Sequence, residues 1–206
     1  MRAQAARAAR LALLACVLAL AACGRSPQLA KLAPDDVVLA FGDSLTYGTG
    51  ASEQEGYPAQ LGQMIGRRVV QSGVPGEVTS QALARLPGEL DEYSPRLLLL
   101  CTGGNDFLHR LGKQQAAANL RAMVRLAKAR NIDVVLIGTP EPSLTLSPPS
   151  FYGDIAAEFH IPYEGSVIGE VLRKPELKSD PVHPNASGYR IVAERLAVLL
   201  RKSGAL

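Results

Sequence analysis

The 206-residue chain contains only three cysteines and no tryptophan. Cys16 and Cys23 lie near the N-terminus, which leaves Cys101 without a second thiol for an internal disulfide in the remaining chain. An exported protein could form disulfides, but this one has no such pair. Cys101 follows a run of four leucines, so we expect it to be a small buried core residue.

The chain also has little net positive charge outside the first ten residues. The net charge is only +3, and Arg2, Arg7 and Arg10 account for three positive charges. The rest is nearly neutral, so the composition implies no basic face for nucleic acid. The chain has no Walker A loop, no C-x-x-C and no H-E-x-x-H motif, so we expect no nucleotide, metal or cofactor.

The apolar stretch near the N-terminus, residues 11–22, is too short to span a bilayer, which needs roughly 20 residues. With the arginines before it and small residues at its end, it has the pattern of an export signal. We predict a signal peptide over residues 1–22, a short polar and proline-containing tether over 23–35, and one domain over 36–206.

The end of this signal, Leu20-Ala21-Ala22-Cys23, resembles the lipobox of bacterial lipoproteins. The resemblance implies cleavage before Cys23, whose thiol would carry diacylglycerol. It implies a protein anchored to a membrane of the bacterial cell envelope, with its domain facing the periplasm or the outside. The alternative is an ordinary export signal cut after an alanine, in which Cys23 is incidental.

The remaining composition, 47 % hydrophobic and 20 % charged, is typical of a globular domain. Short apolar runs alternate with segments of helical period, which predicts an α/β fold: a three-layer α/β/α sandwich with a mostly parallel five-stranded sheet. Ligands bind beyond the carboxyl ends of such strands. The predicted strands are 37–41, 68–71, 97–101, 133–137 and 161–163, and the predicted helices are 57–65, 79–90, 114–130, 151–159 and 187–202.

Four short stretches that follow predicted strands or lie near the C-terminus carry the candidate chemistry. Each is weak alone, because a tetrapeptide such as G-D-S-L occurs by chance. Together, in this order, they resemble the SGNH (GDSL) hydrolases, over about residues 37–202. "GEVTSQALARLP" and "GGND" resemble the thioesterase I, lysophospholipase and arylesterase branch. The stretches are Gly42-Asp43-Ser44-Leu45, Val74-Pro75-Gly76-Glu77, Gly103-Gly104-Asn105-Asp106 and Asp180-Pro181-Val182-His183-Pro184.

The residues themselves indicate nucleophilic catalysis. A serine hydroxyl is a poor nucleophile until an adjacent base takes its proton. His183 is the candidate base for Ser44, and Asp180 would orient and charge-balance it. His109 and His160 are the competing bases; His109 could instead be a rim residue of the site.

Hydrolysis also needs donors for the negative charge of the tetrahedral intermediate. The resemblance assigns this oxyanion hole to the backbone amides of Ser44 and Gly76 and to the side chain of Asn105. The alternatives are a plain turn glycine and a plain turn asparagine. Asp43 adjoins the candidate nucleophile Ser44. We therefore expect its side chain to accept hydrogen bonds from backbone amides of the turn, and not to act as the acid partner of His183.

These features predict an exported serine hydrolase that cleaves carboxylic esters or thioesters of a small acyl substrate through an acyl-enzyme on Ser44. One alternative is a carbohydrate O-acetylesterase acting on polysaccharide. Another is a non-catalytic envelope lipoprotein that only binds. The irregular stretches 48–56 and 139–150 are expected at the rim of the site, but the sequence does not encode an acyl-chain length in a readable form.

Overall fold

A five-stranded sheet forms the centre of the computed structural model, which describes residues 26–206. Its strands are parallel and follow the order β2-β1-β3-β4-β5. The predicted parallel sheet is thus confirmed. The strands are β1 (Val37–Gly42), β2 (Arg68–Gly73), β3 (Leu97–Cys101), β4 (Asp133–Ile137) and β5 (Tyr163–Glu164).

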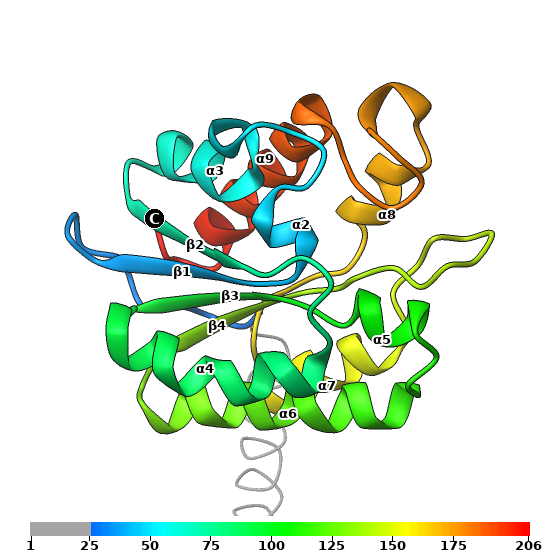
Figure 1. Ribbon diagram of the computed structural model, residues 1–206. Coiled ribbons are helices and arrows are strands. Elements are labelled where there is room, and N and C mark those ends of the chain that lie inside the picture. The colour runs from blue at the N-terminus through cyan, green and yellow to red at the C-terminus, as the bar shows by residue number, and fades with distance from the viewer. Residues whose placement is uncertain (1–25) are drawn as a thin grey trace, which may run out of the picture.

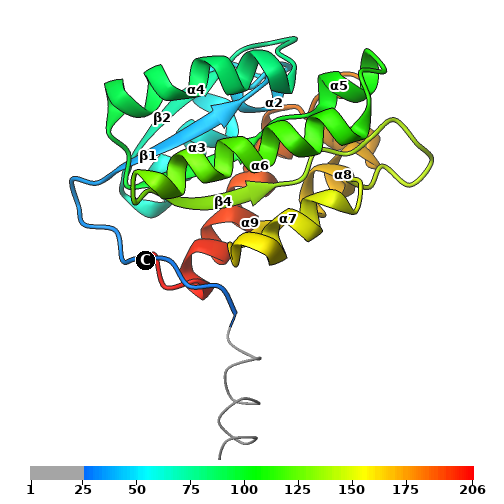
Figure 2. The ribbon, with the colours of Figure 1, turned by 90° about the horizontal axis from the view of Figure 1, so that it is seen from below.

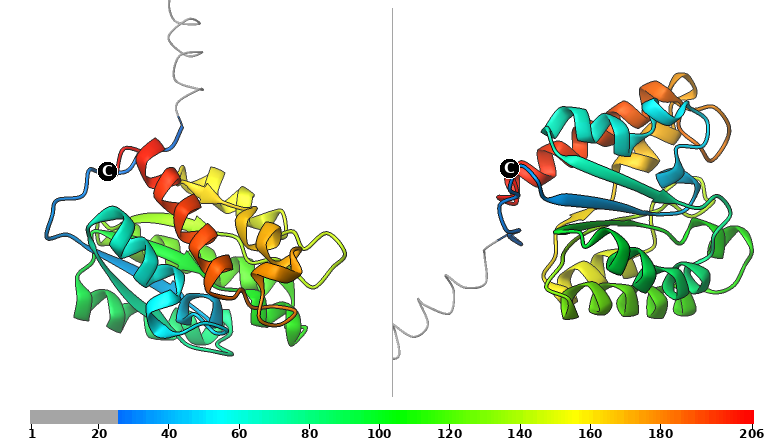
Figure 3. Two further views of the ribbon diagram at one scale, coloured as in Figure 1. Left: turned by 90° about the horizontal axis from the view of Figure 1, so that it is seen from above. Right: turned by 60° about the vertical axis from the view of Figure 1, so that its left-hand side comes forward.

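Helices cover both faces of this sheet, which confirms the three-layer α/β/α architecture (Figure 1). One face packs on α3 (Tyr57–Ile65), α8 (Val167–Leu172) and α9 (Ala186–Lys202). The other packs on α4 (Thr79–Tyr93), α6 (Lys113–Ala129) and α7 (Phe151–Phe159). The right-hand view of Figure 3 shows the two helical layers on opposite sides of the strands.

Successive side chains of a strand point to opposite faces of the sheet, so the sheet separates two hydrophobic cores, one under each helical layer. In β1, Val38 and Ala40 face the α3–α9 side, whereas Leu39 and Phe41 face the α4–α6 side. Both sets are fully buried, which explains why the strand is apolar throughout. Cys101 ends β3 in the first of these cores with no exposed surface.

The structure adds elements that the sequence pattern did not predict. Helices α2 (Ser44–Tyr47), α5 (Gly104–Leu108) and α8 and the 3₁₀ turns Glu53–Glu55 and Pro175–Leu177 have six residues or fewer. Such lengths are too short to display helical periodicity. The fifth strand also begins two residues later than predicted, because Pro162 has no N–H to donate to the ladder.

Part of the predicted tether is packed onto the domain instead of being free. Backbone amides of Leu29 and Leu32 donate to the carbonyl oxygens of Ser203 and Ala205 at 2.8 and 2.9 Å, and Leu32 is 3 % exposed. The folded unit therefore begins before residue 36. The predicted signal peptide and Cys23 lie outside the described residues. Among those described, no helix is both long and apolar enough to cross a membrane.

The strand order reverses between β1 and β3, and this places the candidate residues. Ser44 follows β1 directly and Asn105 lies in α5, just after β3. Because neighbouring parallel strands end at the same edge, both residues reach the crevice beyond the carboxyl ends. The N-terminal segment and the C-terminus lie together at the opposite end of the sheet (Figure 2).

Candidate active site

Ser44 is the first residue of α2 and sits immediately past the end of β1. Asp43 caps this short helix, since its Oδ1 accepts the amide of Leu45 at 3.0 Å, in line with the expectation for the turn. Gly42 is required by packing: a Cβ there would lie 1.8 Å from the carbonyl oxygen of Cys101. The close approach of β1 to β3 thus sets the position from which the Ser44 hydroxyl projects.

His183 comes from the loop before α9 and meets Ser44 across 139 residues of sequence. Its Nε2 lies 2.9 Å from Ser44 Oγ, and its Nδ1 lies 2.7 Å from Asp180 Oδ2. The other oxygen, Asp180 Oδ1, accepts the amides of Val182 and His183 at 2.8 and 2.9 Å. A carboxylate only accepts, so Nδ1 carries the proton and Nε2 is free to accept the hydroxyl hydrogen.

The two nearby carboxyl groups have opposite electrostatic environments. Partial burial opposes ionisation of Asp180, but the hydrogen bonds from the His183 ring and from the backbone outweigh it, and the pKa of Asp180 lies below its usual value. Burial raises the pKa of Asp43 to about 7, despite the hydrogen bond from Leu45. Near neutral pH, Asp180 is therefore ionised, whereas Asp43 carries only part of a charge.

Three donors face the space beside Ser44. Within residues 26–206, the backbone amides of Ser44 and Gly76 have no acceptor. The Nδ2 of Asn105 donates to the carbonyl oxygen of Glu77 at 2.9 Å and retains a second hydrogen. Gly76 has φ +80°, a backbone conformation that favours glycine, and it lines the same cavity as Ser44.

A cavity of about 290 Å³ is lined by Asp43, Ser44, Gly76, Asn105 and His183, but not by Asp180. Of the two loops expected at the rim, 139–150 contributes several residues and 48–56 contributes only Thr49. His109 and His160 do not line it; both are exposed, at the ends of α5 and α7. The wall is largely apolar and includes Leu45, Leu108, Pro140, Pro142, Leu146, Leu172 and Val182.

Comparison with known protein families matches residues 40–191 to the GDSL-like lipase/acylhydrolase family. The protein belongs to this family. The resemblance derived from the four sequence motifs is thereby confirmed, and this GDSL hydrolase is an enzyme that acts on ester bonds.

Relatives cover most of this GDSL hydrolase. The thioesterase 1/protease 1/lysophospholipase L1 of Escherichia coli K12 is 31 % identical over 179 residues, 83 % of this chain and 86 % of that protein. Esterase TesA of Pseudomonas aeruginosa is 28 % identical over 186 residues, 81 % and 89 % of the two chains. The crystal structure of the psychrotrophic esterase EstA from Pseudoalteromonas sp. has the same fold, with a TM-score of 0.73 and 22 % identity over 82 % of this chain and 98 % of that one.

Two buried acids beside the site were not predicted as functional residues. Asp106 accepts the amide and hydroxyl of Thr79 at 2.9 and 2.6 Å, joining α5 to the start of α4. Glu77 pairs with Arg85 and is described below. Both acids lie inside stretches singled out for the resemblance, but nothing in the sequence indicates that they are buried. Among residues 26–206, no cluster of His, Cys, Asp and Glu is arranged to hold a metal ion.

Proposed function

We propose that this GDSL hydrolase cleaves carboxylic esters or thioesters through an acyl-enzyme on Ser44. The observation that carries the proposal is the continuous chain from Asp180 to His183 to Ser44, with contacts of 2.7 and 2.9 Å, at the wall of an apolar cavity. A serine with its base and orienting acid in this geometry is equipped for nucleophilic catalysis.

Each proposed step uses a group already in position. His183 Nε2 takes the hydroxyl proton as Ser44 Oγ attacks the acyl carbon, and the carbonyl oxygen becomes an oxyanion. The amides of Ser44 and Gly76 and the Asn105 side chain donate to that oxyanion. As the oxyanion collapses, the C–O or C–S bond to the leaving group breaks, and the imidazolium, stabilised by Asp180, protonates the departing alcohol or thiol. His183 then takes a proton from water as this water attacks the acyl-enzyme, and it returns the proton to Ser44 Oγ when the bond between Oγ and the acyl carbon breaks and the acid is released.

The apolar wall of the cavity supports an acyl group longer than acetyl as the bound part of the substrate. Leu108, Leu146 and Leu172 would bury methylene groups that a carbohydrate acetylester lacks. A panel of p-nitrophenyl esters of several lengths, acyl-CoA, lysophospholipid and acetylated glycan tests this choice. Hydrolysis of acetylated glycan alone would favour the carbohydrate O-acetylesterase.

Asn105→Ala is expected to lower kcat by roughly 10²–10³ with a smaller effect on KM, as for other oxyanion side-chain donors. The oxyanion develops only in the transition state, so the lost hydrogen bond reduces turnover more than substrate binding. Steady-state kinetics on a p-nitrophenyl ester measure both constants.

Thermal unfolding of the same Asn105→Ala sample provides the control. Asn105 also bonds the Glu77 carbonyl, so its loss could act on stability. Turnover close to that of the wild type, or a loss that disappears at temperatures well below the unfolding midpoint, would remove Asn105 from the proposed oxyanion hole.

We also propose that the protein is exported and anchored through a lipid on Cys23. Leu29 is bound to the C-terminus at the end of the domain opposite the cavity. The six residues from Cys23 to Leu29 reach at most about 20 Å. An enzyme tethered this way would turn its cavity away from its own membrane and meet substrates from the other side.

Cys23→Ser is expected to abolish lipid attachment, because serine lacks the thiol that carries it. Metabolic labelling with a fatty-acid analogue, followed by membrane fractionation, measures the effect, with Cys16→Ser as the matched control that should still be labelled. Label on the Cys23→Ser protein would refute the anchor without affecting the proposed chemistry.

A further inference from the structure

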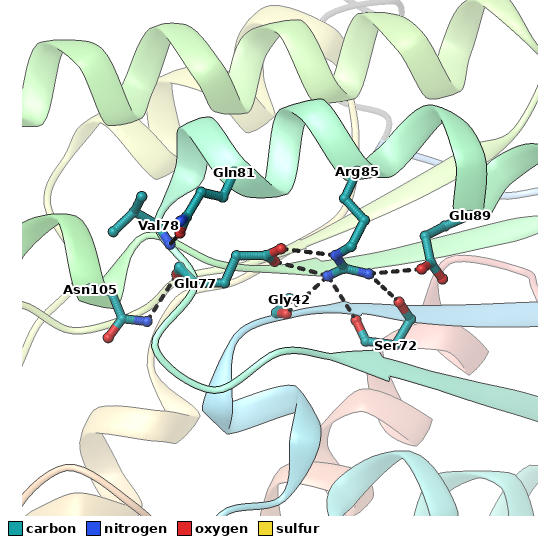
Figure 4. A network of polar contacts seen from close by, with 8 residues as sticks. All are labelled: Gly42, Ser72, Glu77, Val78, Gln81, Arg85, Glu89 and Asn105. Atoms are coloured by element: carbon teal, nitrogen blue, oxygen red, sulfur yellow. Dashed lines mark hydrogen bonds and ion pairs between the residues drawn. The ribbon is translucent and has the colours of Figure 1, made fainter.

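We propose that Arg85 is a positioning residue for the oxyanion hole and acts through Glu77. The inference rests on the proposed acyl-enzyme function and deepens it. Arg85 touches neither the cavity nor Ser44, yet it connects the segments that carry the proposed donors (Figure 4).

Glu77 is the point at which two of these donors are held. Gly76, which lines the cavity and is proposed to donate its amide, is its immediate neighbour in the chain. The carbonyl oxygen of Glu77 accepts the Asn105 side chain at 2.9 Å, which orients the remaining N–H of that amide. A shift of Glu77 would therefore move the Gly76 amide and release the Asn105 side chain together.

Arg85 forms an ion pair with the carboxylate of Glu77 through two hydrogen bonds. Arg85 Nε lies 2.8 Å from Oε1, and Nη2 lies 2.8 Å from Oε2. The Glu77 side chain is 5 % exposed. A carboxylate buried to this degree needs a charged partner, and the planar fork of arginine fixes both oxygens at once.

Arg85 is itself fixed by the ends of the first two strands. Its Nη1 donates to Ser72 Oγ at 2.6 Å and to Glu89 Oε1 at 3.1 Å, and its guanidinium lies 4.2 Å from the centre of the Phe41 ring. A longer contact of 3.5 Å reaches the carbonyl oxygen of Gly42, two residues before Ser44. The Arg85 side chain thus links the loop that contains Gly76 and Glu77 to β1, the strand that precedes Ser44.

Few other contacts hold this loop. Val74, Pro75 and Gly76 are exposed, and a Cβ on Gly76 would meet nothing within 4 Å. Its other hydrogen bonds near the site run from the Val74 amide to Gly42, from the Glu77 amide to Val74, and from the Asn105 side chain to the Glu77 carbonyl oxygen. Of residues 74–77 only Glu77 is buried, and Arg85 holds its side chain, so we expect the position of Gly76 to depend on this ion pair.

Arg85→Lys is the most direct test. Lysine keeps a positive charge near Glu77, so the buried carboxylate retains a counter-ion, but one ammonium cannot reproduce the fork. We expect kcat to fall by about 10-fold to 10²-fold, because small displacements of catalytic groups have effects of that size. KM should change much less, since the donors act on the transition state.

Arg121→Lys is the matched control. Arg121 Nε binds Glu158 Oε2 at 2.6 Å, in an ion pair between α6 and α7 that does not line the cavity. The same chemical change there should leave both kinetic constants at wild-type values.

A double-mutant cycle with Asn105→Ala separates positioning from a general effect on the fold. If Arg85 acts through the donors held by Glu77, the loss caused by Arg85→Lys should shrink once the Asn105 donor is absent. Glu77→Gln is the second variant: it preserves the backbone carbonyl and the size of the side chain, and should lower kcat in the same direction. All variants are assayed well below their own unfolding midpoints.

Wild-type kcat in folded Arg85→Lys or in Glu77→Gln would overturn the inference. An undiminished loss from Arg85→Lys in the Asn105→Ala background would also overturn it. Failure of the proposed function has a different signature, because hydrolysis would then persist in Ser44→Ala. If Ser44 is essential and Arg85→Lys is fully active, only the role of Arg85 is wrong.

Discussion

Ser44→Ala is expected to abolish ester hydrolysis while leaving the fold intact. The change removes the proposed nucleophilic oxygen, so turnover should fall on the order of 10⁴–10⁶-fold, as for the loss of a nucleophile in other serine hydrolases. Within residues 26–206, Ser44 Oγ makes one side-chain hydrogen bond, at 2.9 Å with His183 Nε2, so its removal leaves few polar groups without a partner. The thermal unfolding midpoint should therefore stay close to that of the wild type.

Two measurements test this expectation on the same preparations. Hydrolysis of a p-nitrophenyl ester gives the loss of turnover, and a fluorophosphonate probe reports the reactive hydroxyl directly. Ser80→Ala, an exposed serine on α4, is the matched control and should be both active and labelled. If the probe still labelled the Ser44→Ala protein, the assignment of Ser44 as the nucleophile would be wrong.

His183→Ala should lower turnover by several orders of magnitude, on the order of 10⁴–10⁶-fold as for a triad base elsewhere. Without the ring, Ser44 loses its proton acceptor and Asp180 loses the group that it orients. His109→Ala and His160→Ala are matched controls, because both rings are exposed and lie outside the cavity. They should retain activity close to that of the wild type.

The dependence on pH gives a second readout for His183. An imidazolium cannot accept the hydroxyl proton, so wild-type activity should fall in acid. Hydrogen bonds from the His183 ring and from the backbone hold the pKa of Asp180 below its usual value, so this carboxylate keeps its charge to lower pH than a free aspartate would. The residual activity of His183→Ala should lack this fall. If His160→Ala were equally damaging in a folded protein, the base would be misassigned.

Much of the architecture could be predicted from local patterns. Apolar runs such as residues 97–101 and 133–137 coincide with strands, because a strand buried on both faces has to be apolar throughout. Long periodic segments likewise predicted α6 and α9 to within one residue at each end. The short helices α2 and α5, which hold Ser44 and Asn105, were missed because a single turn has no period.

Residue types and their order along the chain were enough to indicate the candidate chemistry: a serine after a buried strand, an aspartate three residues before a histidine, and a glycine and an asparagine after later strands. How these groups meet depends on the folded arrangement of the chain. Ser44 and His183 are 139 residues apart, and their 2.9 Å contact depends on strand order and on the path of the last loop. The ion pair between Arg85 and the buried Glu77, and the burial of Leu32, likewise become visible only in the folded protein. Local patterns report periodicity and residue type, whereas burial and long-range contacts arise only when the sheet brings distant segments together.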